Sequence, residues 1–168
     1  MTNTDIIKQV LEKMVAQIRS NLQSTGTNAS GRTSDSLKVE VDATSGRIYG
    51  RRYFRGTEQG RAGGRVPRNF NAIIRQWILD KGLTYSAIPY KRQPSASWQP
   101  KYTPQERGLN AMASAIAHTI EKSGTSLYRR GGRKDIFTNV IEENKADLLK
   151  VAKEIITTNL YGKYGTSK

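Results

Sequence analysis

Apolar side chains recur at intervals of three and four residues in four segments of the chain, which is the period of a helix with one buried face. Pro104 is well placed for the first turn of one of these helices, and Gly82 and Gly124 are well placed to end two of them. The predicted helices cover residues 5–22, 69–81, 104–122 and 135–160.

Between the first two helices the apolar period changes to two, which is typical of a half-buried strand. Residues 37–41 alternate apolar and polar side chains, residues 42–46 read as a turn, and residues 47–54 can return as a partner strand. Residues 56–64 then break regular structure. The pattern predicts an α+β fold, in which a β-hairpin or small antiparallel sheet packs with about four α-helices in a single domain over residues 1–168.

Residues 83–103 follow neither period. Four of the chain's five prolines lie within or directly after this stretch, so we expect a long extended loop. Aromatic side chains between the prolines favour docking onto a partner. The predicted docking residues are Tyr85, Tyr90, Trp98 and Tyr102. At the end of the chain, residues 162–168 are predicted to form a flexible tail.

The charge balance narrows the classes of partner. The chain has 28 basic and 14 acidic residues, a net charge of +14, which favours nucleic acid, an acidic protein surface or an anionic membrane. No apolar run approaches the roughly 18 residues that span a bilayer, and the N-terminus does not resemble a signal peptide, so we expect cytoplasmic synthesis and no membrane association. With no cysteine, a disulfide framework and a thiolate metal site are excluded.

The positive charge concentrates in residues 46–68, which contain seven of the fifteen arginines and one acid, Glu58. Such arginines must stay solvated or meet an anionic partner, and arginine suits bidentate contacts with phosphate or carboxylate. Phosphate binding, docking onto an acidic protein and a solvated hairpin end all remain open. A second basic cluster covers residues 129–134. The predicted contact residues are Arg47, Arg51, Arg52, Arg55, Arg61, Arg65, Arg68, Arg129, Arg130, Arg133 and Lys134.

The titratable residues do not form a catalytic pattern. His118 is the only histidine and lies mid-helix, where a structural or surface role is expected. We interpret Glu142, Glu143 and Asp147 as a solvated acidic face of a helix. Glu58 lies among arginines in the sequence, and we expect it to form a structural salt bridge. We therefore expect no enzyme, no cofactor and no bound metal.

Two glycine-rich segments, residues 60–64 and 130–133, could present backbone N–H groups to phosphates. Neither contains the Gly-Lys-Ser/Thr sequence of a phosphate loop or the strand–GxGxxG–helix order of a dinucleotide site. The indication for phosphate binding by these backbones is therefore weak.

The order of the parts resembles that of the neck and tail-completion proteins of tailed bacteriophages, a group also called minor tail or head–tail joining proteins. Members of this family show a Thr-Gly-x-Leu-like element before a hairpin and a Tyr…Glu-x-Gly turn after it. Residues 31–37, Gly-Arg-Thr-Ser-Asp-Ser-Leu, stand for the first element, and Tyr53 followed by Glu58-Gln-Gly60 stands for the second. The resemblance covers residues 5–82 and, loosely, the final helices.

The resemblance implies a non-enzymatic virion subunit in the neck or tail, within a homo-oligomeric ring between the portal or connector and the tail proteins. Such a ring surrounds the DNA channel, which would give its arginines a non-specific contact with DNA. Rings use heterologous contacts, so the basic residues 46–68 and the acidic residues 142–147 are a candidate pair between neighbouring subunits. The alternative function is sequence-independent nucleic-acid binding, with an affinity that falls steeply with salt.

Overall fold

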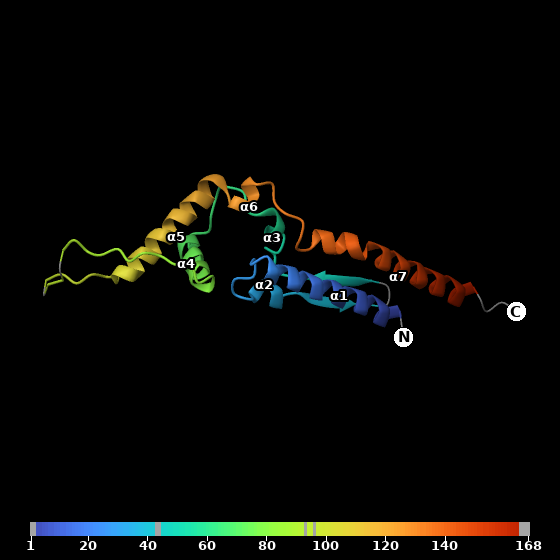
Figure 1. Cartoon of the computed structure of the whole chain (residues 1–168). Helices are drawn as coiled ribbons and strands as arrows, with labels where there is room; N and C mark the ends of the chain where they lie inside the picture. The colour runs from blue at the N-terminus through green and yellow to red at the C-terminus, as the bar shows by residue number, and fades with distance from the viewer. Residues whose placement is uncertain (1–2, 43–44, 93, 96, 165–168) are drawn as a thin grey trace. The chain divides into compact units, whose positions relative to one another are not determined.

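The computed structural model describes residues 3–42, 45–92, 94–95 and 97–164, and it has the predicted α+β fold (Figure 1). Contacts within the chain group it into two compact units. Unit 1 comprises Met1–Glu58 and Arg133–Lys168, and unit 2 comprises Gln59–Gly132. The single folding domain over residues 1–168 stays a prediction.

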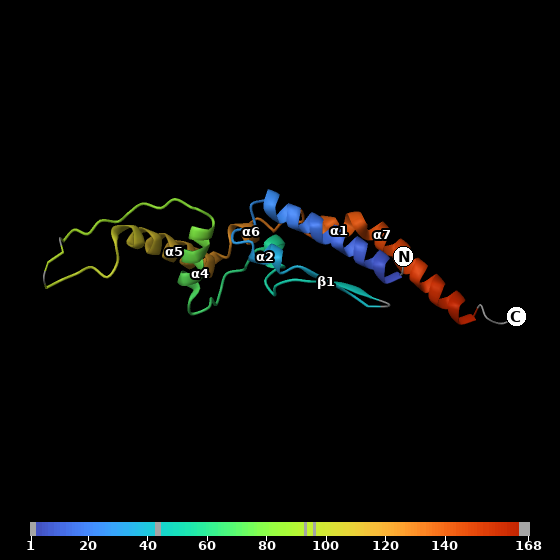
Figure 2. The same ribbon diagram turned by 90° about the horizontal axis from the view of Figure 1, so that it is seen from below.

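Unit 1 is built from two long helices and a hairpin. Helices α1 and α7 lie side by side and antiparallel, and the hairpin packs against α1 (Figures 1 and 2). In the hairpin register Lys38 is opposite Tyr49 and Val41 is opposite Gly46. The elements are α1 (Asn3–Ser24), β1 (Lys38–Val41), β2 (Gly46–Tyr49) and α7 (Thr138–Tyr164).

The core of unit 1 confirms the predicted apolar stripe of the first helix. Its buried side chains come from α1, from the residue before β1, and from α7 and the turn before it. They are Ile7, Leu11, Met14, Val15, Ile18, Leu22, Leu37, Ile136, Val140, Val151 and Ile155. Gly46 permits the hairpin to approach α1, because a Cβ atom there would lie 2.5 Å from side-chain atoms of Ile7 and Leu11.

The predicted second strand is too long. Strand β2 ends at Tyr49, and the chain then folds into turns in which Phe54 N donates to Arg51 O and Thr57 N donates to Phe54 O. The aromatic ring of Phe54 lies 5.3 Å from that of Phe137, so packing against the start of α7 overrides strand pairing. Three single-turn helices were not predicted, one of them where residues 56–64 were expected to be irregular. They are α2 (Arg32–Asp35), α3 (Gly56–Gln59) and α6 (Ser126–Arg129).

Unit 2 is centred on the packing of α4 (Phe70–Asp80) against α5 (Pro104–Ser123), with boundaries within a residue of those predicted. Thr103 and Glu106 form a capping box at the start of α5: the Thr103 hydroxyl accepts from Glu106 N, and the Glu106 carboxylate accepts from Thr103 N. The buried core residues of unit 2 are Ile74, Ile78, Leu109, Ala113 and Ala117.

The predicted long loop over residues 83–103 is confirmed. Its described residues form no helix and no strand, apart from an isolated bridge between Ser95 and Trp98. Figures 1 and 2 show it extending past the N-terminal end of α5. The last helix begins three residues later than predicted and continues through Tyr164, so the predicted tail at 162–168 begins too early; residues 165–168 lie outside the described residues. In the described part of the chain, no helix is both long and apolar enough for a membrane span.

Candidate functional site

The predicted basic contact residues are divided between the two units. Nine of the eleven side chains are exposed, and Arg61 and Arg133 are partly buried. Those in unit 1 are Arg47, Arg51, Arg52, Arg55, Arg133 and Lys134. Those in unit 2 are Arg61, Arg65, Arg68, Arg129 and Arg130.

Arg133 has internal partners. Its guanidinium makes a bidentate ion pair with the Asp135 carboxylate, with an Nη2–Oδ2 distance of 2.6 Å, and Nη1 donates to the Thr27 hydroxyl at 3.4 Å. The hydrogen bond between the two groups raises the pKa of Arg133 and lowers the pKa of the Asp135 carboxyl. These contacts assign Arg133 a structural role that the sequence pattern did not predict.

Arg61 is also held within its own unit. Its guanidinium lies over the ring of Phe70, 5.2 Å from the centroid, and Nη2 donates to the carbonyl of Arg65 at 2.6 Å. The backbone N–H of Arg61 donates to the Thr125 hydroxyl at 2.9 Å. We therefore exclude Arg61 and Arg133 from the candidate surface.

In unit 1 the exposed arginines are concentrated in Arg51–Arg55, a segment that we call the basic turn. Phe54 anchors this turn on Phe137, and the backbone N–H of Arg51 donates to the Ser36 hydroxyl at 3.2 Å. Arg51, Arg52 and Arg55 are exposed, and Tyr53 is 82% exposed. An aromatic anchor thus fixes a turn that presents basic side chains to solvent.

Arg47 lies near the basic turn in sequence, on β2. Its guanidinium is within 3.5 Å of the Tyr49 hydroxyl, and this hydrogen bond is the main cause of a raised pKa for Arg47. Because the charge of arginine is permanent at physiological pH, the shift leaves its capacity for anion contact unchanged.

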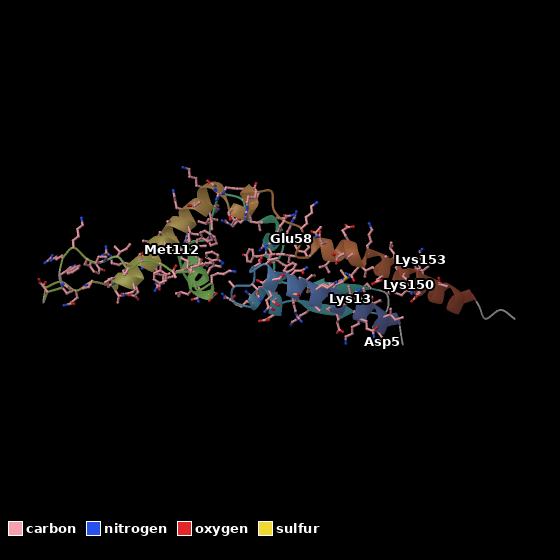
Figure 3. The ribbon with its side chains drawn as sticks, in the orientation of Figure 1. Asp5, Lys13, Glu58, Met112, Lys150 and Lys153 are labelled. Atoms are coloured by element: carbon pink, nitrogen blue, oxygen red, sulfur yellow. The ribbon has the colours of Figure 1, made fainter. Side chains whose placement is uncertain are left out.

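Glu58 has a role that sequence reasoning missed. Its side chain is only 2% exposed, and one carboxylate oxygen accepts from the N–H groups of Ile136, Phe137 and Thr138 at 2.9, 2.7 and 2.9 Å. The other oxygen accepts from the Thr138 hydroxyl. Glu58 therefore caps the N-terminus of α7 from a distant part of the chain, where sequence reasoning expected a structural salt bridge (Figure 3).

Many backbone donors of the glycine-rich segments serve the fold. In residues 60–64, two of the five do so: Arg61 N donates to the Thr125 hydroxyl and Gly64 N donates to the carbonyl of Glu121 at 2.6 Å. All four N–H groups of residues 130–133 donate to backbone carbonyls, among them Arg133 N to Glu58 O at 2.8 Å. The suggested phosphate contact through the amides of residues 130–133 is therefore not supported, and the one through residues 60–64 stays a prediction.

The aromatic residues predicted for docking are mostly brought together. Tyr90 and Trp98 meet edge to face at 5.4 Å between centroids, and the Tyr90 hydroxyl donates to the Tyr102 carbonyl at 2.9 Å. Tyr85 instead lies partly buried against the core of unit 2, at the base of the loop. Three of the four predicted docking residues thus link the outgoing and returning lengths of the loop. The fourth, Tyr85, anchors the loop to the core of unit 2.

The acidic residues on α7 are exposed, as predicted. Glu142 and Glu143 face solvent, and Asp147 forms an exposed ion pair with Lys13 on α1 at 3.3 Å. His118 is exposed on α5. Within the described ranges, no three His, Cys, Asp or Glu side chains are grouped so that they could hold a metal ion.

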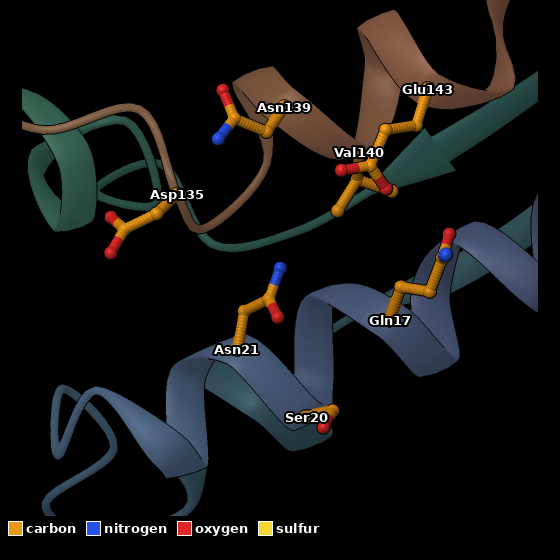
Figure 4. Close-up of a pocket in the computed structure, with 7 residues that line it drawn as sticks. All are labelled: Gln17, Ser20, Asn21, Asp135, Asn139, Val140 and Glu143. Atoms are coloured by element: carbon orange, nitrogen blue, oxygen red, sulfur yellow. The ribbon is translucent and has the colours of Figure 1, made fainter.

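A shallow pocket in unit 1 lies between α1 and the start of α7 (Figure 4). Its volume is about 310 Å³, and it is lined mainly by polar side chains. Asn21, one of the residues that line it, also has a structural role, because its amide donates to the Ile136 carbonyl at 3.1 Å. The lining residues are Gln17, Ser20, Asn21, Asp135, Asn139, Val140 and Glu143.

Comparison of the chain with protein-family models, with curated proteins and with solved structures found no match in any of the three. We therefore infer its function from the residues themselves and from the resemblance in the order of the sequence elements.

Proposed function

We propose that this protein is a structural virion subunit of a tailed bacteriophage, part of a homo-oligomeric neck or tail-completion ring around the DNA channel. Its neighbours in this proposal are the portal or connector and the tail proteins. The observation that supports it best is the presence of two exposed surfaces of opposite charge on separate elements of unit 1. These surfaces are the basic turn and the acidic pair Glu142 and Glu143 on α7.

A closed ring requires this kind of surface pair. Each subunit in a cyclic assembly with heterologous contacts uses one patch to meet a different patch of its neighbour. Complementary charge at such a contact directs encounter and fixes the register more than it adds affinity. The basic turn packs through Phe54 on Phe137, and the acidic pair lies on a helix capped by Glu58, so both surfaces are supported by contacts within unit 1.

A charge-swap experiment tests this pairing. The double change Arg51→Glu and Arg52→Glu should abolish incorporation into particles made by a phage that lacks its own copy of the gene. Circular dichroism should still show a folded protein, because both side chains are exposed. Adding Glu142→Arg and Glu143→Arg should restore incorporation by reversing the complementary surface.

The outcomes are distinct. Normal incorporation of the arginine double variant would contradict the pairing. Loss of incorporation without rescue by the swap would show that the basic turn meets a different partner, such as an acidic surface of the portal.

The alternative function is sequence-independent nucleic-acid binding. The observation that supports it is the excess of positive charge in unit 2. Unit 2 carries twelve basic and three acidic residues, whereas unit 1 carries sixteen and eleven. A protein with this role alone would bind duplex DNA with a steep salt dependence and would be absent from purified particles.

A further inference from the structure

The loop over residues 83–103, which we call the arm, has contacts between its outgoing and returning lengths. Tyr90 and Trp98 join its outgoing and returning lengths through their rings, and Tyr90 also bonds the carbonyl of Tyr102. Near the tip, Ser95 and Trp98 exchange backbone hydrogen bonds of 2.9 and 3.1 Å. These contacts hold the outgoing and returning lengths of the arm together.

The base of the arm is fixed to α5. Arg107 donates to the carbonyls of Ile88 and Pro89 at 3.0 and 2.8 Å, and Ile88 N donates to the carbonyl of Pro104. The backbone at Ser86 lies so close to α5 that a Cβ atom on Gly108 would be 1.9 Å from its carbonyl oxygen. This anchoring leaves the outer part of the arm as a preformed projection from unit 2.

The arm carries positive charge only. No acidic residue occurs between Asp80 and Glu106, while Lys91, Arg92 and Lys101 are exposed on its two lengths. Three cations lie over the arm's own aromatic rings: Arg107 over Tyr90 at 4.0 Å, Arg92 over Trp98 at 5.5 Å, and Lys101 over Tyr102 at 5.3 Å. The cationic groups are thus held in place by the rings beneath them.

We propose that the arm contacts the phosphate backbone of duplex DNA without reading its sequence. Lysine and arginine on both of its lengths match phosphates on both sides of a groove. Proteins that bind single strands stack bases on free aromatic faces, and here a cation lies over each of the three rings. An interface with an acidic protein would bury large apolar anchors, and the rings of Tyr90 and Trp98 already pack on each other.

This inference rests on the proposed function and deepens it by assigning the DNA contact to the arm. The test uses the purified full chain and a fluorescein-labelled 20-base-pair duplex of arbitrary sequence, with fluorescence anisotropy between about 50 and 200 mM salt. The arm variant is Lys91→Ala, Arg92→Ala and Lys101→Ala. The matched control is Lys145→Ala, Lys150→Ala and Lys153→Ala, which removes the same charge from exposed positions on α7 (Figure 3 labels Lys150 and Lys153).

We expect the arm variant to bind the duplex at least about tenfold more weakly at 100 mM salt. The slope of log affinity against log salt should become less steep by about 0.9 for each phosphate that the protein no longer neutralises, or roughly 2.7 for three. The control should keep the slope of the unmodified protein. Equal weakening in both variants would overturn the proposal, since net charge alone would then explain binding.

Two further probes separate the alternatives. Tighter binding of a 20-nucleotide oligothymidylate than of the duplex, abolished by Trp98→Ala, would show base stacking and overturn the proposal. Unchanged duplex binding by the arm variant, together with abolished binding of polyglutamate, would identify an acidic protein partner instead. Because these assays need no particles, absence of the protein from virions would defeat the proposed ring and leave the result for the arm standing.

Discussion

At the scale of single residues, Glu58 shows how a charged side chain in an arginine-rich segment can be a structural element. A buried carboxylate is costly unless its oxygens are hydrogen-bonded, and here four donors at the start of α7 satisfy them. The arrangement also favours the helix, since the otherwise unpaired N–H groups at a helix N-terminus attract negative charge.

Replacing Glu58 by Ala should lower the free energy of unfolding by about 2–4 kcal/mol, because three helix N–H groups lose their acceptor. Glu58→Gln should cost less, since the amide retains one oxygen that can accept. Urea denaturation followed by circular dichroism measures both. Glu40→Ala, at an exposed position on β1, is the matched control and should change stability by less than about 0.5 kcal/mol. A loss for Glu58→Ala no larger than that of the control would contradict the capping role.

The sequence pattern predicted correctly that most of the clustered arginines are exposed, but it did not predict the structural roles of individual charged residues. Exposure of the basic turn follows from composition, because arginine is seldom fully buried. The internal roles of Arg61, Arg133 and Glu58 depend on partners distant in sequence, such as Thr125, Thr27 and Thr138. No local pattern indicates these partners, so these interactions could not be predicted.

At the scale of elements, the long helices were predictable because apolar residues recur along each of them at helical spacing. The errors occur where packing between distant segments decides. Phe54 leaves the expected strand to meet Phe137, and the single-turn helices α2, α3 and α6 are too short to show a period. Pro104 allowed the start of α5 to be placed accurately, since proline favours the first turn of a helix. The capping box of Thr103 and Glu106 was found only in the structure.

The capping box of α5 leads to a prediction about pH. A hydrogen bond from Thr103 N is the main cause of a pKa for Glu106 below its ordinary value of 4.5, and Arg75 at 3.9 Å contributes in the same direction. The unfolded chain therefore binds the proton more readily than the folded one. This stabilisation is present above pH 4.5 and is lost as the pH falls through the lower pKa of the folded state.

Thermal unfolding between about pH 3 and 6 should thus show a component of acid destabilisation that depends on Glu106. The variant Glu106→Gln should be less stable than the unmodified protein at pH 6, and the difference should shrink as the pH falls. Glu121→Gln, at an exposed position further along α5, serves as the control. A difference that stays constant over this range would contradict the assignment.

At the scale of the whole molecule, the division of the chain into two units was not predictable. The chain leaves unit 1 at Glu58 and returns to it at Arg133, and a backbone hydrogen bond of 2.8 Å joins these two residues. Within unit 2, residues 60–64 pack against the turn after α5, where Gly124 accommodates the close approach of the Arg61 carbonyl. Composition changes little at either crossing, so the sequence gives no sign of a boundary there.

The excess of positive charge belongs mainly to unit 2, whereas the charge pair proposed for ring contacts lies in unit 1. This division suggests separate tasks: unit 1 for contacts between subunits, and unit 2 with its arm for contact with DNA. In the proposed ring both tasks serve one assembly, so the central claim is that the protein is a component of the virion.

Quantitative mass spectrometry of purified phage particles from the system that encodes this gene tests that claim most directly. We predict a low and fixed number of copies per particle, in a simple ratio to the portal protein. Absence of the protein from particles that contain their full complement of portal would contradict the claim, and sequence-independent nucleic-acid binding would then become the leading function.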